Sequence, residues 1–233
     1  MTLKRIFGKI LSKKIKGEIF PVKKDLFMSI VKEGYPFIVI PFVIGAALIF
    51  SGAGAFFFIL GLLCVSAALF CAYFFRDPSV NITQGQGLIL SPCNGTVLEV
   101  GENENEKFIR VFLSVLDVHL QRSPVAGKVT KVEYKPGKFL KAMEPQAHIV
   151  NEQNHITIEN ENGIYTVKQV AGILARRCVS WVKAGDELQA GDKIGLIKFS
   201  SQVDLHMPKN ANIKVKKDDK VVSGVTVFAV LDK

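Results

Sequence analysis

The sequence predicts a mainly β protein, a barrel-sandwich-like domain with two hammerhead-like repeats, preceded by an N-terminal transmembrane helical hairpin. Residues 34–75 contain no Asp, Glu, Lys, Arg or His, whereas the rest of the 233-residue chain has an ordinary soluble composition. After residue 78, short apolar alternations are punctuated by glycine, a pattern typical of strands. We therefore expect a basic arm over residues 1–33, a membrane hairpin over 34–75 and a β domain over 76–233.

The positive charge is concentrated in the N-terminal arm. Residues 1–33 hold nine basic and three acidic side chains, which leaves 21 basic against 18 acidic in the remainder. A basic segment beside an apolar one is typical of contact with anionic lipid headgroups, and it stays on the cytoplasmic side by the positive-inside tendency. Nucleic acid is therefore not an expected partner.

The apolar region has the length of two membrane-crossing helices. Residues 36–53 and 55–75 each approach the roughly 20 apolar residues that a helix needs to cross a bilayer, and residues 51–54 form a glycine-containing break between them. Two crossings return the chain to the cytoplasmic side, so we expect a cell-membrane protein whose β domain faces the cytoplasm. The alternative is a wedge in one leaflet, because Pro36 and Pro41 weaken the first helix.

The β domain contains an internal repeat. Residues 182–194 and 215–227 lie 33 positions apart, share four identical residues and have the same strand, turn, strand rhythm. Such a repeat favours two hammerhead-like units packed face to face, as in biotinyl and lipoyl carrier domains. A carrier function is disfavoured, because no lysine occupies a hairpin tip in the setting that carriers use.

A few polar residues stand where chemistry is expected. His119 directly follows a strand, where side chains commonly enter a site. Arg176 and Arg177 follow an apolar segment. Either one of them grips a phosphate while the other makes a structural ion pair, or both are simply solvated. Ser200 and Ser201 interrupt an apolar run, and a serine hydroxyl can attack the carbonyl of its own preceding peptide bond. The four cysteines show no metal-binding spacing, so no metal site is expected.

Taken together, these residues resemble the short, archaeal-type form of phosphatidylserine decarboxylase, a pyruvoyl-dependent enzyme. The likeness runs over nearly the whole chain after about residue 32 and depends on the order and spacing of several stretches. These are FFRDP (74–78), SPCNGTV (91–97), DVH (117–119) with PVAG (124–127), YKPGKF (134–139), NE (151–152), AG (171–172) with ARR (175–177), VKAGD (182–186) and IKFSSQVD (197–204).

The resemblance implies a function and a set of site residues. The chain would cut itself between Ser200 and Ser201, and chains 1–200 and 201–233 would stay associated. The pyruvoyl group derived from Ser201 would form a Schiff base with phosphatidylserine and decarboxylate it to phosphatidylethanolamine. Assembly into a homo-oligomer is left open. His119 would act as cleavage base and, with a pKa near neutrality, as proton donor. The remaining assignments are Asp117 or Asn94 as its orienters and Arg176, Arg177 and Lys198 as ligands of the lipid phosphate.

Two positions depart from the family pattern. The family usually has Gly where this chain has Ser200, and Asp where it has Asn94. An amide cannot stabilise an imidazolium as a carboxylate does, although Asn94 has the alternative role of holding the turn before Gly95. The departures leave a second hypothesis open, a cleavage-deficient relative that acts as a membrane-anchored lipid-binding or scaffold domain.

Overall fold

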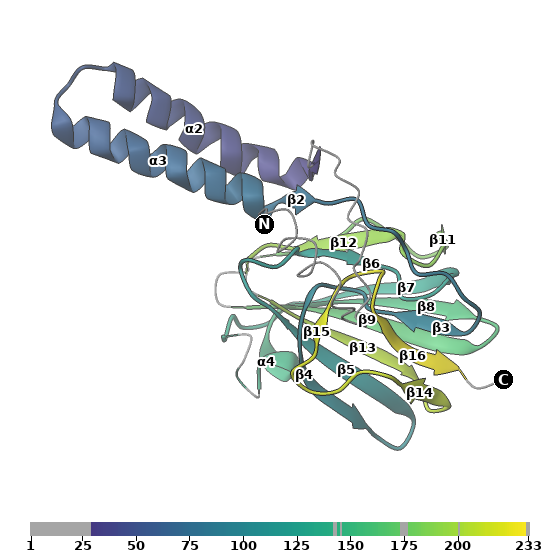
Figure 1. Ribbon diagram of the computed structural model, residues 1–233. Helices are drawn as coiled ribbons and strands as arrows, with labels where there is room; N and C mark the ends of the chain where they lie inside the picture. Colours follow the sequence, from purple (N-terminus) through teal and green to yellow (C-terminus); the bar gives the residue numbers. More distant parts are fainter. Residues whose placement is uncertain (1–28, 142–143, 145, 173–176, 200, 232–233) are drawn as a thin grey trace, which may run out of the picture.

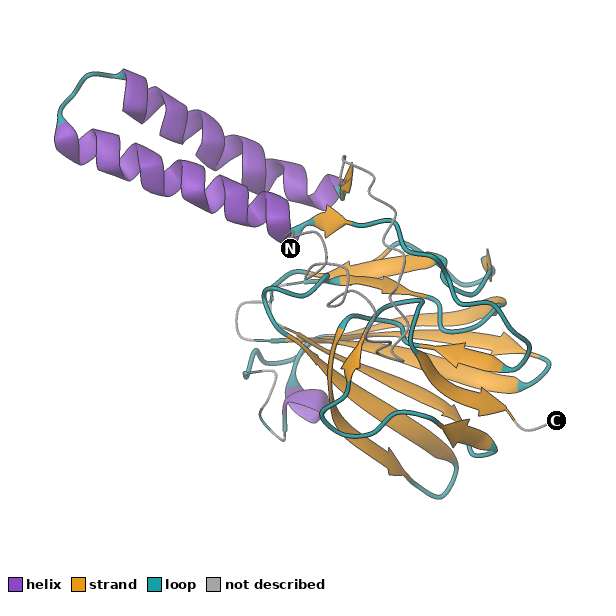
Figure 2. Ribbon diagram, viewed as in Figure 1, coloured by secondary structure: helices purple, strands orange, loops and turns teal. Residues whose placement is uncertain are grey.

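The computed structural model describes residues 29–141, 144, 146–172, 177–199 and 201–231 (Figure 1). A pair of long helices projects from one side of a body made almost entirely of strands (Figure 2). The mainly β prediction is confirmed for this body. Most of the expected basic arm, residues 1–28, lies outside the described residues.

The projecting helices form the predicted hairpin. Helix α2 (Tyr35–Phe50) follows a 3-10 turn, η1 (Lys32–Gly34), and packs along α3 (Ala55–Phe74). Gly45 and Gly61 meet at the contact, where a Cβ atom on either residue would lie 2.8 Å from the other's carbonyl oxygen. Small residues therefore let the two backbones approach closely, as they do in membrane helix pairs.

The outer surface of the hairpin is apolar. Phe50 and Phe56 are 88% and 72% exposed, and most large apolar side chains of both helices also face outward. The segments Lys32–Phe50 and Ala55–Phe74 are long and apolar enough to cross a membrane. Because so much exposed apolar surface is unfavourable in water, the hairpin indicates membrane association. The choice between spanning and wedge-like insertion stays a prediction.

The body is built on one antiparallel eight-stranded sheet that curls into a half barrel, with the strand order β11-β7-β8-β9-β13-β5-β4-β15 (Figure 1). Two three-stranded sheets accompany it, and a two-stranded ladder with β1 (Ser29–Ile30) and β2 (Arg76–Asp77) joins the base of the hairpin. The strands of the large sheet are β4 (Gly95–Glu102), β5 (Glu106–Leu113), β7 (Gly127–Lys135), β8 (Gln153–Asn160), β9 (Gly163–Ala171), β11 (Glu187–Leu188), β13 (Ser201–Pro208) and β15 (Lys220–Val221). One of the smaller sheets contains β6 (Leu120–Arg122), β10 (Cys178–Ser180) and β12 (Lys193–Ile197). The other contains β3 (Leu88–Leu90), β14 (Ala211–Ile213) and β16 (Val227–Leu231). A one-turn helix, α4 (Ala147–Val150), precedes β8.

The described residues contain two apolar clusters. The main core is mostly aliphatic and lies inside the half barrel, where Val203, Leu205 and Met207 of β13 contribute alternate side chains. A second cluster lies where the hairpin meets the body, and we call it the junction cluster. Its buried members are Val31, Phe74, Phe75, Val118, Leu120 and Leu196, and Ile30, Cys71, Trp181 and Phe199 pack against them.

The two copies of the internal repeat supply equivalent short strands. Segments 182–194 and 215–227 contain β11 and β15, which lie at opposite edges of the eight-stranded curled sheet. The local structure of the two segments is the same. Each starts with a turn in which an aspartate carboxylate accepts a hydrogen bond from the backbone N–H three residues earlier. Asp186 accepts from the Lys183 N–H and Asp219 from the Lys216 N–H, both at 2.9 Å. The hammerhead description itself stays a prediction.

Candidate active site

Ser201 is the first residue of β13 and is completely buried. It is paired with Leu113 of β5 on one side and Ala171 of β9 on the other. Its hydroxyl oxygen is buried and has no hydrogen-bond partner among the described residues. A buried hydroxyl without a partner is unfavourable in a folded protein, so it is a feature expected at a reactive position. Ser200 lies outside the described residues.

Phe199 has an unusual backbone two residues before Ser201. Its φ angle is 62°, in the left-handed region, which only one other non-glycine residue of the described chain, Asp218, adopts. For a bulky side chain this conformation costs about 1–2 kcal/mol relative to the right-handed region. Such strain persists only where surrounding contacts enforce it, and it is found mainly at functional sites.

His119 is 1% exposed and has a defined hydrogen-bonding state. Its Nδ1 atom lies 2.9 Å from the backbone carbonyl oxygen of Asp117. A carbonyl oxygen can only accept a hydrogen bond, so we assign the proton of the neutral ring to Nδ1. The other nitrogen, Nε2, then carries a lone pair, and it is buried without a partner in the part of the chain that the structure describes. His119 is therefore able to accept a proton at Nε2.

Burial lowers the pKa of His119 to about 4, and the hydrogen bond and negative charge of Asp117 offset this only in part. The expectation of a pKa near neutrality is therefore wrong for the uncleaved chain, because the ring is removed from water. At neutral pH the imidazole is uncharged. This state suits a general base, which must begin without the proton that it accepts.

Buried amides fix the backbone of His119. The His119 carbonyl oxygen accepts a hydrogen bond from Gln121 Nε2 at 2.7 Å and another from the Ile197 N–H at 3.2 Å. Gln169 Nε2 in turn donates to Gln121 Oε1, and Asn154 donates to Gln169 Oε1. Because Ile197 ends β12 only four residues before Ser201, this network holds His119 beside the chain segment that leads to the serine.

The two expected orienters of His119 have other side-chain partners. The Asp117 carboxylate accepts the Ser114 N–H at 2.8 Å, so Asp117 contacts the imidazole through its backbone oxygen instead. Asn94 Oδ1 accepts the Ser223 N–H at 3.2 Å, and this bond supports the turn before β4. Among the contacts described, neither side chain reaches the ring of His119.

Two of the three expected phosphate ligands lie close together. The Lys198 N–H donates to the Arg177 carbonyl oxygen at 3.2 Å, which joins the two backbones. The Lys198 ammonium lies 5.3 Å from the ring centroid of Phe37, in the first turn of α2, and Arg177 is exposed. The Lys198 charge is thus near the base of the hairpin, and the backbone of Arg177 lies beside that of Lys198. Arg176 lies outside the described residues.

A pair of adjacent polar residues supports the strand opposite Ser201. Asn151 Nδ2 donates to the carbonyl oxygen of Ala171, which is the β9 partner of Ser201. The Glu152 carbonyl oxygen accepts the Ala171 N–H, and the Glu152 carboxylate accepts from Tyr134. These bonds hold the end of β9 in place beside the serine, which is a structural reason for the NE pair at 151–152.

Comparison with known proteins identifies the family. A family model described as phosphatidylserine decarboxylase matches residues 67–229. The chain belongs to the phosphatidylserine decarboxylase family. A phosphatidylserine decarboxylase proenzyme from Beijerinckia indica is 41% identical over 84% of this chain and 87% of that protein. Those of Symbiobacterium thermophilum and Geotalea uraniireducens are 41% and 39% identical, each over 87% of this chain and over 95% and 96% of their own length.

Membership of the decarboxylase family gives the buried serine and histidine a common context. The Phe74 ring contacts both the His119 ring and the Phe199 ring, with centroid distances of 4.4 and 4.5 Å. Sequence reasoning noted the stretches that contain Phe74 and Phe199 but assigned neither residue a role. It also missed the buried amides Gln121 and Gln169. No periodicity distinguishes these residues from ordinary core positions, so only the folded arrangement identifies them.

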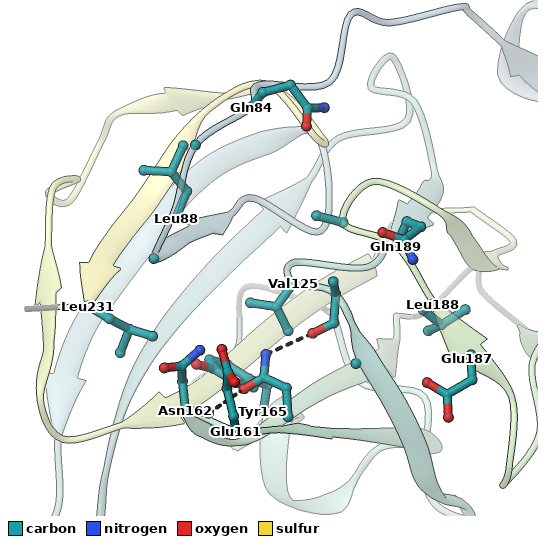
Figure 3. A pocket seen from close by; sticks show the side chains of 16 residues that line it. Gln84, Leu88, Val125, Glu161, Asn162, Tyr165, Glu187, Leu188, Gln189 and Leu231 are labelled. Carbon is teal, nitrogen blue, oxygen red and sulfur yellow. Dashed lines mark hydrogen bonds between the residues drawn. The ribbon is translucent and has the colours of Figure 1, made fainter. Parts of the chain in front are cut away.

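A large cavity lies elsewhere in the β body. It has a volume of about 810 Å³ and lies between β3, the start of β7, the β8–β9 turn and β11 (Figure 3). Tyr165 belongs to its lining, and the buried hydroxyl of this residue has no hydrogen-bond partner within the described ranges. Gly163 in that turn is close to Pro208, at the far end of β13 from Ser201. The cavity is therefore at the opposite end of the sheet from the candidate active site.

Proposed function

We propose that the chain is a proenzyme that cuts itself between Ser200 and Ser201, and that the cleaved protein decarboxylates phosphatidylserine to phosphatidylethanolamine. The observation that carries this proposal is the buried, unpartnered hydroxyl of Ser201 beside a strained backbone, in a chain of the phosphatidylserine decarboxylase family. The term proenzyme in the names of the relatives agrees with an inactive precursor that is processed.

The proposed cleavage uses the Ser201 hydroxyl as its nucleophile. Ser201 Oγ attacks the carbonyl carbon of residue 200, and the peptide becomes an ester with a free amino group on residue 201. Loss of the Cα proton of Ser201 then breaks the bond between Cβ and the ester oxygen, which leaves chain 1–200 with a carboxylate and residue 201 as dehydroalanine. Water replaces the amino nitrogen, ammonia leaves, and residue 201 becomes a pyruvoyl group.

His119 supports this step as the base. Its Nε2 carries the lone pair and lacks a competing hydrogen-bond partner, so it is free to accept the Ser201 proton. The backbone oxygen of Asp117 holds the ring in this tautomer. General-base assistance of this kind contributes about 10²–10⁴-fold in rate.

The same residues serve the decarboxylation. The pyruvoyl group supplies a ketone that accepts the substrate amine and takes up the electron pair left when carbon dioxide departs. The residues around position 201 fit that group, because its methyl group would stand where the Ser201 side chain now lies, and a methyl group needs no hydrogen-bond partner at a position where the described residues offer the hydroxyl none. His119 holds or delivers the proton at Nε2. The lipid phosphate is bound by Arg176, Arg177 and Lys198. Each charged hydrogen bond of this type contributes about 1.5–3 kcal/mol where water is excluded.

The hairpin explains how the site meets its substrate. We propose that residues 34–75 anchor the chain in the membrane and that the site lies near the lipid headgroups. The basic arm over residues 1–33 and the catalytic domain over residues 76–233 then both lie on the cytoplasmic side. Support comes from the apolar exterior of the hairpin and from the Lys198 contact with Phe37 at its base. Anionic lipid would collect beside the basic arm.

The deciding experiment is the intact mass of the full-length protein purified from membranes. The proposal predicts two chains, residues 1–200 and 201–233, with a ketone at the new N-terminus that reacts with hydroxylamine or is reduced by borohydride. Phosphatidylserine in vesicles should then release carbon dioxide. A single full-length chain without a reactive ketone would overturn the proposal.

The second candidate, a cleavage-deficient lipid-binding or scaffold domain, is motivated by Ser200 and Asn94. The double variant Asn94→Asp with Ser200→Gly separates the two candidates. If cleavage appears only in that variant, the native chain is the degenerate relative. The hydrogen bond of Asn94 to Ser223 favours the decarboxylase, because it gives the amide a supporting role in which no imidazolium has to be stabilised.

A further inference from the structure

The hairpin and the scissile segment are joined through Phe74, the last residue of α3. Phe74 is 1% exposed, and its ring lies 4.5 Å from that of Phe199 at an interplanar angle of 25°. The ring of His119 lies 4.4 Å from Phe74 at 38°. One side chain of the membrane hairpin therefore contacts both the candidate base and Phe199, which lies two residues before Ser201.

Phe199 is enclosed by further rings of the hairpin. Phe75 meets it edge to face at 5.8 Å, and Phe37 of α2 does so at 6.2 Å. Aromatic pairs in stacked and edge-to-face arrangements are favourable. Because the left-handed backbone of Phe199 is unfavourable for its residue type, such contacts are what can keep it in that conformation.

The base of the hairpin is also bonded to the loop that carries His119. Arg76 Nη2 donates to the carbonyl oxygen of Leu116 at 2.7 Å, and its guanidinium lies 3.8 Å from the ring centroid of Tyr73. On the other side, the Val31 N–H donates to the Phe75 carbonyl oxygen. These bonds fix the end of α3 relative to the body, so the position of Phe74 depends on a docked hairpin.

We infer that Phe74 is a positioning residue for self-cleavage: its ring holds Phe199 in the left-handed conformation and fixes the plane of His119. This inference rests on the proposed function and deepens it. It makes cleavage conditional on docking of the hairpin, so that the ketone forms only in a chain whose membrane anchor is in place.

The test compares variants in the full-length, membrane-bound protein. Phe74→Leu keeps apolar volume but loses the flat ring, and Phe74→Ala removes both. Conversion of full-length protein to two chains is followed by pulse-chase between pH 4 and pH 8. Small displacements of reacting groups cost up to about 10²-fold, so we expect Phe74→Leu to slow conversion about 10- to 100-fold. The control is Phe70→Ala, on the same helix and 41% exposed, which should convert at the wild-type rate.

A rescue separates positioning from general stability. Glycine adopts a left-handed backbone without a penalty, so Phe199→Gly combined with Phe74→Leu should recover part of the lost rate. A destabilised fold would not recover on losing a second ring. A wild-type rate in Phe74→Leu, an equal loss in Phe70→Ala, or no recovery in the double variant would each overturn the inference. If limited proteolysis shows that Phe74→Ala is unfolded, Phe74→Leu decides.

The inference also has a readout that does not need cleavage. In the uncleavable Ser201→Ala background, NMR titration of His119 should give a pKa of about 4 with Phe74 present. With Phe74→Ala, water reaches the ring, and the pKa should rise towards its ordinary value of 6.5. An unchanged pKa would overturn the contact with His119. Absence of cleavage in the wild type would instead overturn the proposed function, so the two failures are distinguishable.

Discussion

The two halves of the β body have the same scaffold, but only one carries the candidate active site. In one half, β3 pairs with β16, the start of β4 pairs with β15, and the turn at Ser91 lies between β3 and β4. In the other half, β6 pairs with β12, the start of β7 pairs with β11, and the turn at Ser123 lies between β6 and β7. The turns are held alike. Ser91 Oγ donates to the Cys93 carbonyl oxygen at 2.7 Å, and Ser123 Oγ donates to that of Val125 at 2.6 Å.

The halves differ in what flanks this scaffold. His119 stands immediately before β6, whereas Gly87 stands immediately before β3. Strand β12 leads into Phe199 and Ser201, whereas β16 leads to the end of the described chain. The junction cluster covers only the half with β6 and β12. The comparison teaches that the repeated scaffold supplies stability, and that the site arises where the membrane hairpin is added to one copy.

The largest expected difference between the halves concerns two buried serines. Ser201→Ala should abolish cleavage and decarboxylation completely, because it removes the attacking hydroxyl. Ser91→Ala removes a hydroxyl that only holds a turn, so the chain should still cleave while unfolding about 1 kcal/mol more easily. Gel electrophoresis and a carbon dioxide assay give both results. Two chains from Ser201→Ala would place the reaction elsewhere.

The next effect is that of the flanking histidine. His119→Ala should slow cleavage by about 10²–10⁴-fold, the usual contribution of a positioned general base. His119→Gln, which has nearly the same volume, should be slow as well, because an amide nitrogen accepts no proton. Pulse-chase of the proenzyme measures both rates. Wild-type kinetics in either variant would remove His119 from the site.

Acid should destabilise the half that carries His119. The pKa of this ring is lowered from 6.5 to about 4 in the fold, so below pH 6.5 the unfolded chain binds a proton that the native chain does not. Stability is therefore complete above pH 6.5 and decreases as pH falls to 4, by up to about 3 kcal/mol. Half-buried His155, with a pKa also lowered to about 4, contributes in the same direction. Urea unfolding of the Ser201→Ala proenzyme measures this dependence, and His119→Gln should weaken it; an identical dependence would contradict the burial argument.

The smallest expected effect is shared equally by the halves. Asp186→Ala and Asp219→Ala each remove a carboxylate that accepts a backbone N–H at 2.9 Å in an equivalent turn. Each should lower the free energy of unfolding by about 1 kcal/mol. Thermal unfolding of the two variants in one detergent makes the comparison. A markedly larger loss for one of them would mean that the two scaffolds are unequal.

Much of the fold follows from local sequence patterns. The uncharged run over residues 34–75 predicted the hairpin because a helix of apolar side chains is favourable only away from water. The glycines at 52 and 54, with φ angles of 65° and 102°, ended and restarted the helices as expected. Alternating side chains predicted strands such as β8 and β9, and the ordered stretches from FFRDP to IKFSSQVD identified the family before the comparisons did.

The functional environment did not follow from such patterns. The near-neutral pKa expected for His119 was wrong because burial depends on what covers the ring. The face-to-face packing of the two repeat copies stays a prediction, because strand partners far apart in sequence decide how a sheet closes. The sequence by itself determined the hairpin and the strands, and it gave Ser201 and His119 as candidate site residues. Only the tertiary structure decided that Phe74, Phe199 and His119 meet, since contacts between residues 45 to 125 positions apart depend on how the whole chain packs.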